Sequence, residues 1–180
     1  MITINSLSKS VFTLIAPIVM ISCNKTEKTP STAINWVSLD KAMILNKENK
    51  KKIYICMYTD WCKWCHIFDS ATLSNPKIIE FINDNYYAVR LNAETIDTIH
   101  FNNNTYMNKS HKMGCPNEFA NFLLHAKLNY PASVFLDEEL SRIGAPTYGY
   151  YKASDFKALL SYYSSDKYKT STFAEYLKSL

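Results

Sequence analysis

A pair of cysteines is the feature of this sequence with the clearest chemistry. Cys62 and Cys65 lie in the stretch TDWCKWCH, residues 59–66, where His66 directly follows the second cysteine. A Cys-x-x-Cys pair is typical of a redox dithiol, whereas Cys-x-x-Cys-His is also the pattern to which haem is covalently attached. The stretch therefore predicts redox chemistry of one of two kinds, and the rest of the sequence has to decide between them.

The N-terminal residues indicate export. An apolar run at residues 11–21 follows Lys9 and ends at Ser22 and Cys23. The run is shorter than the ~20 residues that a membrane-spanning helix needs, but it suits the hydrophobic region of a signal peptide. It resembles a bacterial lipoprotein signal, which implies that Cys23 is lipidated. The alternative is an uncleaved anchor with an incidental Cys23, and both place the folded part outside the cytoplasm, tethered to a membrane and facing the periplasm.

The chain divides into three parts on this prediction. We expect a lipoprotein-type signal peptide at residues 1–22, a flexible tether at residues 23–35 and a folded domain at residues 36–180. The tether is polar and contains a proline. The whole chain is 47% hydrophobic, which is enough for one globular core. The net charge is +4 and residues 50–52 are the only dense basic run, so we do not expect nucleic-acid binding.

Export bears on the cysteines, because thiols outside the cytoplasm can oxidise. With Cys23 assigned to lipid, four remain: Cys56, Cys62, Cys65 and Cys115. A disulfide between Cys62 and Cys65 would close a very small loop and gain little stability from chain entropy. A redox role explains the close pair better than a structural one.

Strand and helix patterns alternate along the domain. Short runs rich in β-branched and aromatic residues predict buried strands at residues 53–58, 86–91 and 132–136. Helical spacing of apolar residues predicts helices at residues 39–46 and 117–128, and helices that start at Cys62, at Asn75–Pro76 and at Ser154. This alternation is typical of an α/β fold.

With the dithiol at a strand-to-helix junction, the chain resembles the thioredoxin superfamily over residues 36–164. The resemblance rests on the strand that ends at Tyr58, on the motif at residues 61–65, and on the stretch YPASVFLD that starts at Tyr130. With His66 it further resembles a bacterial WCxWCH-type branch. The resemblance implies a thioredoxin-like fold, in which a central mixed β-sheet is flanked by helices, and a cis peptide bond before Pro131.

The same resemblance assigns roles around the dithiol. A thiolate attacks a disulfide, so the nucleophile needs a lowered pKa, which a helix N-terminus and the Lys63 cation favour. We expect Cys62 to be this exposed nucleophile, and Cys65, one turn further on and shielded, to be the resolving thiol. The expected substrate-binding residues are Trp61, Lys63, Trp64, Tyr130 and Pro131. We expect neither a metal nor a cofactor.

One position departs from the family. The acid that its best-studied members bury six residues before the first cysteine is replaced by Cys56. Asp60 is closer in sequence, but we expect it on an exposed loop, so the proton acceptor for Cys65 is left open. Cys56 is most simply a small core residue.

An insertion at about residues 93–116 separates the second predicted strand from the cis-proline strand. Residues 98–107 alternate around an Asn-rich turn, which predicts a hairpin. The spacing of His100, His111 and Cys115 matches no standard metal site, so we expect a polar loop. A role for Cys115 as a redox partner of the dithiol is left open.

A haem protein remains the less favoured alternative. His66 would be its proximal ligand, and Met107 or Met113 would be the distal one. A small c-type cytochrome is mostly helical, and it would not explain the three strands.

We therefore predict a thiol:disulfide oxidoreductase that acts on protein or peptide disulfides, as a reductase or isomerase. A membrane thiol reductase would be its electron donor. The alternative from another class is a non-catalytic thioredoxin-like module that binds peptides, for which loss of a cysteine would be the sign, and both cysteines are present.

Overall fold

A mixed five-stranded sheet forms the centre of the molecule. The computed structural model describes residues 31–110, 112 and 114–180, so the predicted signal peptide, Cys23, His111 and Met113 lie outside the described residues. The strand order is β1-β3-β2-β6-β7. The strands are β1 (Trp36–Val37), β2 (Lys52–Tyr58), β3 (Tyr86–Asn92), β6 (Ala132–Leu136) and β7 (Arg142–Tyr148). The first three are parallel, and β6 and β7 run antiparallel to their neighbours.

Strand β2 lies in the middle of this sheet and is buried on both faces. Ile53, Ile55 and Met57 point into one apolar core, whereas Tyr54 and Cys56 point into the other. A strand buried on both sides reads as a continuous apolar run, which is why the sequence predicted it.

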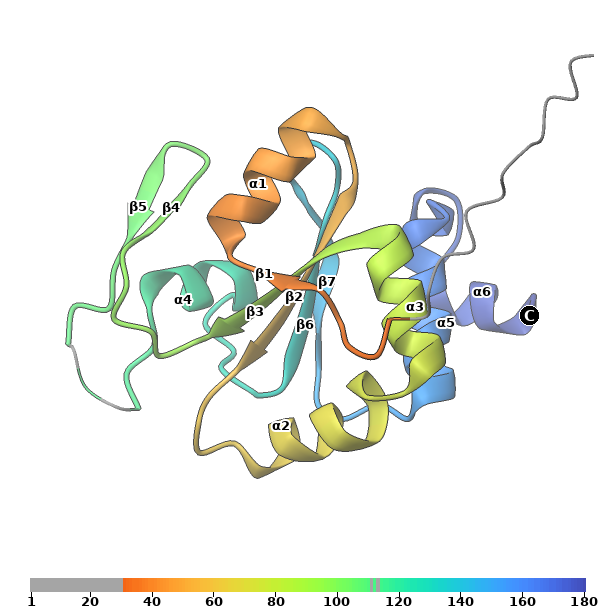
Figure 1. Cartoon of the computed structure of the whole chain (residues 1–180), viewed down its shortest axis with the longest axis horizontal. Coiled ribbons are helices and arrows are strands. Elements are labelled where there is room, and N and C mark those ends of the chain that lie inside the picture. The colour runs from red at the N-terminus through yellow and green to blue at the C-terminus, as the bar shows by residue number, and fades with distance from the viewer. Residues whose placement is uncertain (1–30, 111, 113) are drawn as a thin grey trace, which may run out of the picture.

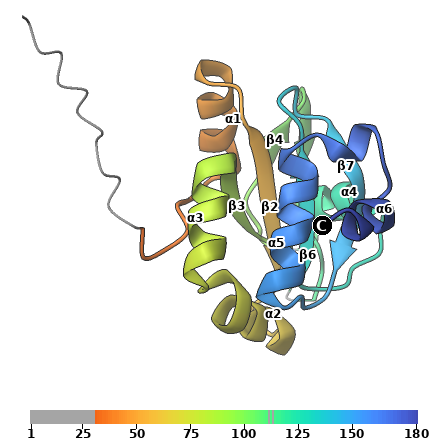
Figure 2. The same ribbon diagram turned by 90° about the vertical axis from the view of Figure 1, so that its right-hand side faces the viewer.

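Two layers of helices cover the sheet (Figures 1 and 2). On one face lie α1 (Leu39–Glu48) and α4 (Glu118–Leu124), and on the other lie α3 (Pro76–Asn85) and α5 (Ala153–Ser164). Ser38, Asn75 and Asn117 cap α1, α3 and α4 by accepting hydrogen bonds from backbone N–H groups of the first turn. The predicted thioredoxin-like α/β architecture is confirmed.

The helix that carries the dithiol lies at the end of β2 (Figure 1). It consists of α2 (Lys63–Phe68), which continues directly into the π-helical segment η1 (Asp69–Leu73). The predicted hairpin is present as β4 (Ile99–Phe101) and β5 (Asn104–Tyr106). After α5 the chain forms a 3₁₀ turn, η2 (Lys167–Lys169), and a short helix, α6 (Phe173–Lys178).

The structure differs from the sequence prediction at β1, β7 and α4, and it adds η2 and α6 after the last predicted helix. The two edge strands, β1 and β7, were not predicted, because β1 has only two residues and β7 contains Gly144 and Pro146, which are tolerated at a sheet edge. Helix α4 ends at Leu124 rather than near residue 128, because His125 and Ala126 adopt left-handed backbone conformations. Phe122 of this helix is exposed.

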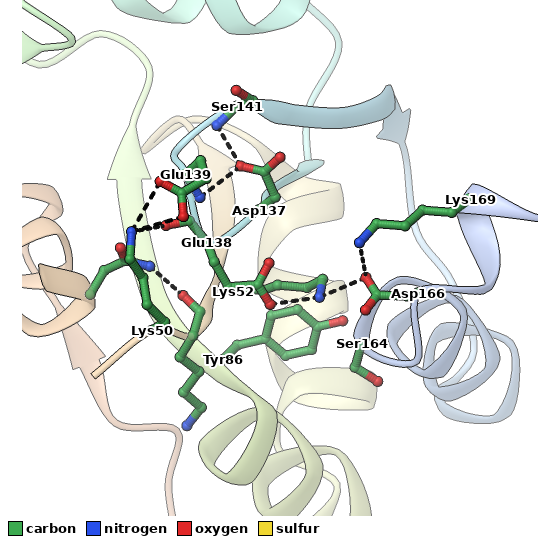
Figure 3. A network of polar contacts seen from close by, with 12 residues as sticks. Lys50, Lys52, Tyr86, Asp137, Glu138, Glu139, Ser141, Ser164, Asp166 and Lys169 are labelled. Carbon is green, nitrogen blue, oxygen red and sulfur yellow. Dashed lines mark hydrogen bonds and ion pairs between the residues drawn. The ribbon is translucent and has the colours of Figure 1, made fainter. Parts of the chain in front are cut away.

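A buried lysine joins three segments at the end of β2 opposite the dithiol (Figure 3). The Lys52 side chain is 5% exposed, and its Nζ lies 2.8 Å from Glu138 Oε1 and 3.0 Å from Asp166 Oδ1. Burial disfavours the ammonium, but the hydrogen bonds to these carboxylates more than offset it and raise the pKa of Lys52. The Lys52 ammonium in turn lowers the pKa of Asp166. Lys52 thus fixes the β6–β7 turn and the segment after α5 to the central strand.

Substituting Lys52 should make the stability less dependent on pH. The Asp166 carboxyl has a folded-state pKa below its unfolded value of about 3.9, so its stabilisation is complete above about pH 5 and is lost as the pH falls through the folded value. We expect Lys52→Met to lower the free energy of unfolding by about 1–2 kcal/mol at pH 7, allowing for the solvent exposure of both acids, and by less at about pH 3. Urea unfolding at both pH values measures this, and an equal loss at both would assign the effect to packing instead.

Candidate active site

Cys62 and Cys65 form a disulfide at the junction between β2 and α2. Their Cα atoms are 5.3 Å apart. Both residues are buried, with exposed fractions of 5% for Cys62 and 2% for Cys65. The expectation that Cys62 is exposed was therefore wrong for the disulfide form. Its sulfur is bonded to Cys65, and its backbone N–H donates to the Thr59 carbonyl at 3.1 Å, which holds it against the end of the sheet.

The helix start provides a polar environment for the Cys62 sulfur. Cys62 is the N-cap of α2, and its Sγ accepts a hydrogen bond from the Cys65 N–H at 3.2 Å. The first residue of the helix is Lys63, whose side chain is exposed. Unpaired N–H groups, the positive end of the helix dipole and this cation all favour negative charge on the sulfur.

A cis proline lies beside β2, the strand that leads to the disulfide. The Tyr130–Pro131 peptide bond is cis, as the resemblance implied, and Pro131 is buried. The next residue, Ala132, pairs with Met57 near the end of β2, so Pro131 lies at the same edge of the sheet as the dithiol. The Pro131 carbonyl accepts a hydrogen bond from the Gly149 N–H at 2.8 Å, which joins the end of β7 to this loop.

Two tryptophans flank the buried cysteines. Trp61 and Trp64 are 59% and 58% exposed. The Trp61 ring lies 6.3 Å from that of Tyr130 in an edge-on arrangement, and its Nε1–H donates to Glu94 Oε1 at 2.8 Å. The Trp64 ring lies 6.4 Å from that of Tyr150. The structure therefore brings together four of the five predicted substrate-binding residues, Trp61, Trp64, Tyr130 and Pro131, with the fifth, Lys63, between the cysteines.

Glu94 and Tyr150 were not predicted from the sequence. Glu94 follows the C-terminal end of β3, which lies next to β2 in the sheet, and that position was a usable signal. Burial and the neighbouring Glu94 carboxylate raise the pKa of Tyr130 to about 12, so this hydroxyl stays protonated at neutral pH. Tyr150 follows a strand that the sequence did not reveal, so no signal pointed to it.

Behind the dithiol the core carries an uncharged thiol and a neighbouring ion pair. Cys56 is fully buried, as expected, and burial raises its pKa to about 11. Arg90, its register partner on β3, forms two hydrogen bonds of 2.8 and 2.6 Å to the Asp69 carboxylate in η1. The guanidinium also lies 4.5 Å from the centre of the Tyr58 ring. This ion pair attaches the helix that carries the dithiol to the sheet.

Other polar side chains of the motif face solvent. Asp60 lies on an exposed turn, as expected, and its carboxylate accepts a hydrogen bond from the Asn92 amide at 3.0 Å. His66 is exposed, and its Nε2 lies 3.4 Å from the Asp60 carbonyl oxygen. Asp60 therefore holds the motif turn against the end of β3.

The insertion carries no metal cluster among the residues that the structure describes. His100 contacts Thr105 across the hairpin, Nδ1 to Oγ1, at 3.1 Å. The buried Asn108 donates its amide to the carbonyls of Glu94 and Cys115 at 3.2 and 2.8 Å. Cys115 has a free thiol and is half-buried. In its described residues the insertion consists of the hairpin and a polar loop, and its residue Glu94 binds the Trp61 indole.

Comparison with known proteins agrees with this geometry. The sequence profile of a thioredoxin-like domain matches residues 39–164. A thioredoxin-fold protein from Helicobacter pylori is 18% identical with a TM-score of 0.55, covering 73% of this chain and 84% of that one. The DsbH oxidoreductase is 18% identical with a TM-score of 0.50, covering 77% and 90%. Identities this low show the fold alone.

One curated relative also matches. An uncharacterised protein from Caenorhabditis elegans is 27% identical over 94 residues, which are 44% of this chain and 13% of that protein. The chain thus spans a small part of that relative, and the match assigns no function to it.

The observed fold argues against the haem alternative. That alternative predicted a mostly helical architecture, whereas the structure is built on a five-stranded sheet.

Removing the Asp69 carboxylate should loosen the helix that carries the dithiol. We expect Asp69→Asn to lower the free energy of unfolding of the oxidised protein by about 1–3 kcal/mol, because a charge-assisted bidentate pair is lost and the half-buried Arg90 is left poorly paired. Urea unfolding is the measurement.

Glu139→Gln is the matched control. It removes the Lys50–Glu139 pair, whose side chains are 53% and 77% exposed, and it should cost less than about 0.5 kcal/mol. Equal small losses in the two variants would mean that the Asp69–Arg90 pair does not attach the helix to the sheet.

Proposed function

Because the chain belongs to the thioredoxin-like domain family, we propose that it is a thiol:disulfide oxidoreductase that acts on protein or peptide disulfides through Cys62 and Cys65. The observation that carries this proposal is the disulfide itself, which lies at the start of α2. The cis Pro131 at the same edge of the sheet supports it. The alternative of a non-catalytic binding module would not need a pair of cysteines at bonding distance.

In the reductive direction the reduced protein attacks the substrate. The Cys62 thiolate attacks one sulfur of the substrate disulfide, the substrate S–S bond breaks, and the first substrate thiolate leaves and takes up a proton. Cys65 loses its proton and attacks the Cys62 sulfur of the mixed disulfide. The second substrate thiolate then leaves, and the protein is left with the Cys62–Cys65 disulfide. Two electrons have moved from the protein dithiol to the substrate.

We further propose that the protein works as a reductase or isomerase. Redox poise depends on how strongly the reduced form is stabilised. Lys63 and Trp64 lie between the cysteines, so this dipeptide supplies only one cation to stabilise the reduced form. Limited stabilisation of the reduced form favours a reductase or isomerase over a strong oxidase. A reductase needs a dithiol donor to return it to the reduced form, and a membrane thiol reductase fits a protein tethered at the membrane.

The two cysteines should behave differently in a trapping experiment. Cys65→Ser should accumulate mixed disulfides between Cys62 and substrate proteins, because the resolving thiol is missing. Cys62→Ser should abolish turnover and trapping together. Non-reducing gels of cells that express each variant, with identification of the captured proteins, provide the measurement.

The assignment of the nucleophile has its own check. Alkylation of the reduced protein over a pH series should modify Cys62 at a lower pH than Cys65 or Cys115, because of the helix start and Lys63. If either of the other two reacts first, or if Cys62→Ser still traps substrates, the assigned nucleophile is wrong.

We also propose that the protein is a lipoprotein exported to the periplasm and anchored through Cys23. Among the residues that the structure describes, none of the helices is long and apolar enough to cross a membrane. The apolar run at residues 11–21 and the following Cys23 support the proposal.

Substituting Cys23 should test the anchor. We expect Cys23→Ala to release the chain from the membrane fraction or to leave its precursor uncleaved, as judged by fractionation and mass spectrometry. Cys115→Ala is the control and should stay at the membrane in processed form. If wild type and Cys23→Ala both stay at the membrane with residues 1–22 attached, the apolar run is an anchor.

A further inference from the structure

Each cysteine of the dithiol has an aromatic pair of its own. Trp61, before Cys62, contacts Tyr130, which belongs to the cis-proline loop. Trp64, before Cys65, contacts Tyr150, which follows β7. The two tryptophans are more than half exposed although they adjoin a buried disulfide. Large aromatic side chains left open beside a reactive group indicate a surface that another molecule covers.

The Trp64–Tyr150 pair is held to the site by the backbone. Gly149 has a φ of +88°, a conformation that glycine adopts readily, and this turn directs the chain from β7 toward α2. The Gly149 N–H donates to the Pro131 carbonyl at 2.8 Å. The Tyr150 ring also meets Phe68 of α2 edge-on at 6.5 Å. The pair is thus attached both to the cis-proline loop and to the helix that carries the dithiol.

We propose that Trp64 and Tyr150 form a specificity-determining subsite, which selects disulfides in which the attacked cysteine has an aromatic or other large apolar residue next to it. This proposal rests on the proposed oxidoreductase function. The occupant follows from continuity with the dithiol, because the Trp64–Tyr150 surface adjoins the cysteine pair to which a substrate presents its sulfur. A polypeptide with an apolar side chain beside its cysteine covers that surface, whereas a small anionic disulfide such as glutathione disulfide offers no side chain to fill it.

A competing explanation is that Tyr150 only shields Phe68 and that Trp64 only shields the disulfide. Both roles would make substitutions at these positions act equally on every substrate. A subsite acts on the difference between substrates, so the preference between two matched peptides separates the two explanations.

The test uses two peptide disulfides of identical sequence except for the residue next to the cysteine, which is Phe in one and Ser in the other. We expect the purified chain, reduced before the assay, to favour the Phe peptide by about tenfold in kcat/KM, mainly through KM, as an aromatic contact of ordinary strength would give. Trp64→Ala should reduce this preference to less than about twofold. Tyr150→Ser should do the same and provides a second variant if one of them folds poorly.

Phe122→Ala is the matched control. Phe122 is an exposed aromatic residue on α4 that packs against the hairpin residues Phe101 and Tyr106, so its loss should leave activity and preference unchanged. Equal rates on the two peptides in the wild type, or an unchanged preference in both site variants, would overturn the subsite and leave the oxidoreductase function intact. Failure of the wild type to reduce either peptide would overturn the function itself.

Discussion

The burial of β2 on both faces is the constraint on which the rest of the molecule depends. Its side chains alternate between two apolar cores, so a shift by one residue would exchange the contents of both. Pairing with β3 on one side and β6 on the other fixes where Tyr58 ends the strand. That end point sets the position of Cys62 relative to Pro131, since the dithiol and the cis proline lie on neighbouring segments. The geometry of the site is therefore a consequence of core packing.

Charges are placed at the two ends of this apolar centre rather than within it. At the start of β2, Lys52 is surrounded by the carboxylates of Glu138 and Asp166. Near its other end, Arg90 pairs with Asp69. Each cluster joins segments that are distant in sequence, and in each the opposite charges offset the cost of burial. Cys56, beside the second cluster, adds no charge to the core, because its raised pKa of about 11 leaves it a thiol at neutral pH.

The sequence predicted the central features of the fold because those features depend on local patterns. The strands β2, β3 and β6 are short apolar runs. Three of the helices have a polar N-cap residue directly before the helical pattern of apolar residues. Edge strands lack such a pattern, since they are half exposed and tolerate glycine and proline. The prediction of a cis bond before Pro131 came from family resemblance, because no local property of the chain distinguishes it from a trans bond. Glu94 and Tyr150 contact the two tryptophans of the motif only through the tertiary fold.

Glu94 shows how the insertion and the site are connected. Its carboxylate accepts the hydrogen bond from the Trp61 indole, while its carbonyl oxygen accepts one from the buried Asn108 amide. Asn108 also donates to the carbonyl of Cys115. This one side chain therefore joins both ends of the loop between the hairpin and α4 to Glu94, the residue that orients Trp61. A segment that contributes no residue to the disulfide thus shares a hydrogen-bond network with the tryptophan that precedes the first cysteine. The position of Trp61 is determined from two directions, by the ring of Tyr130 on the cis-proline loop and by the insertion through Glu94.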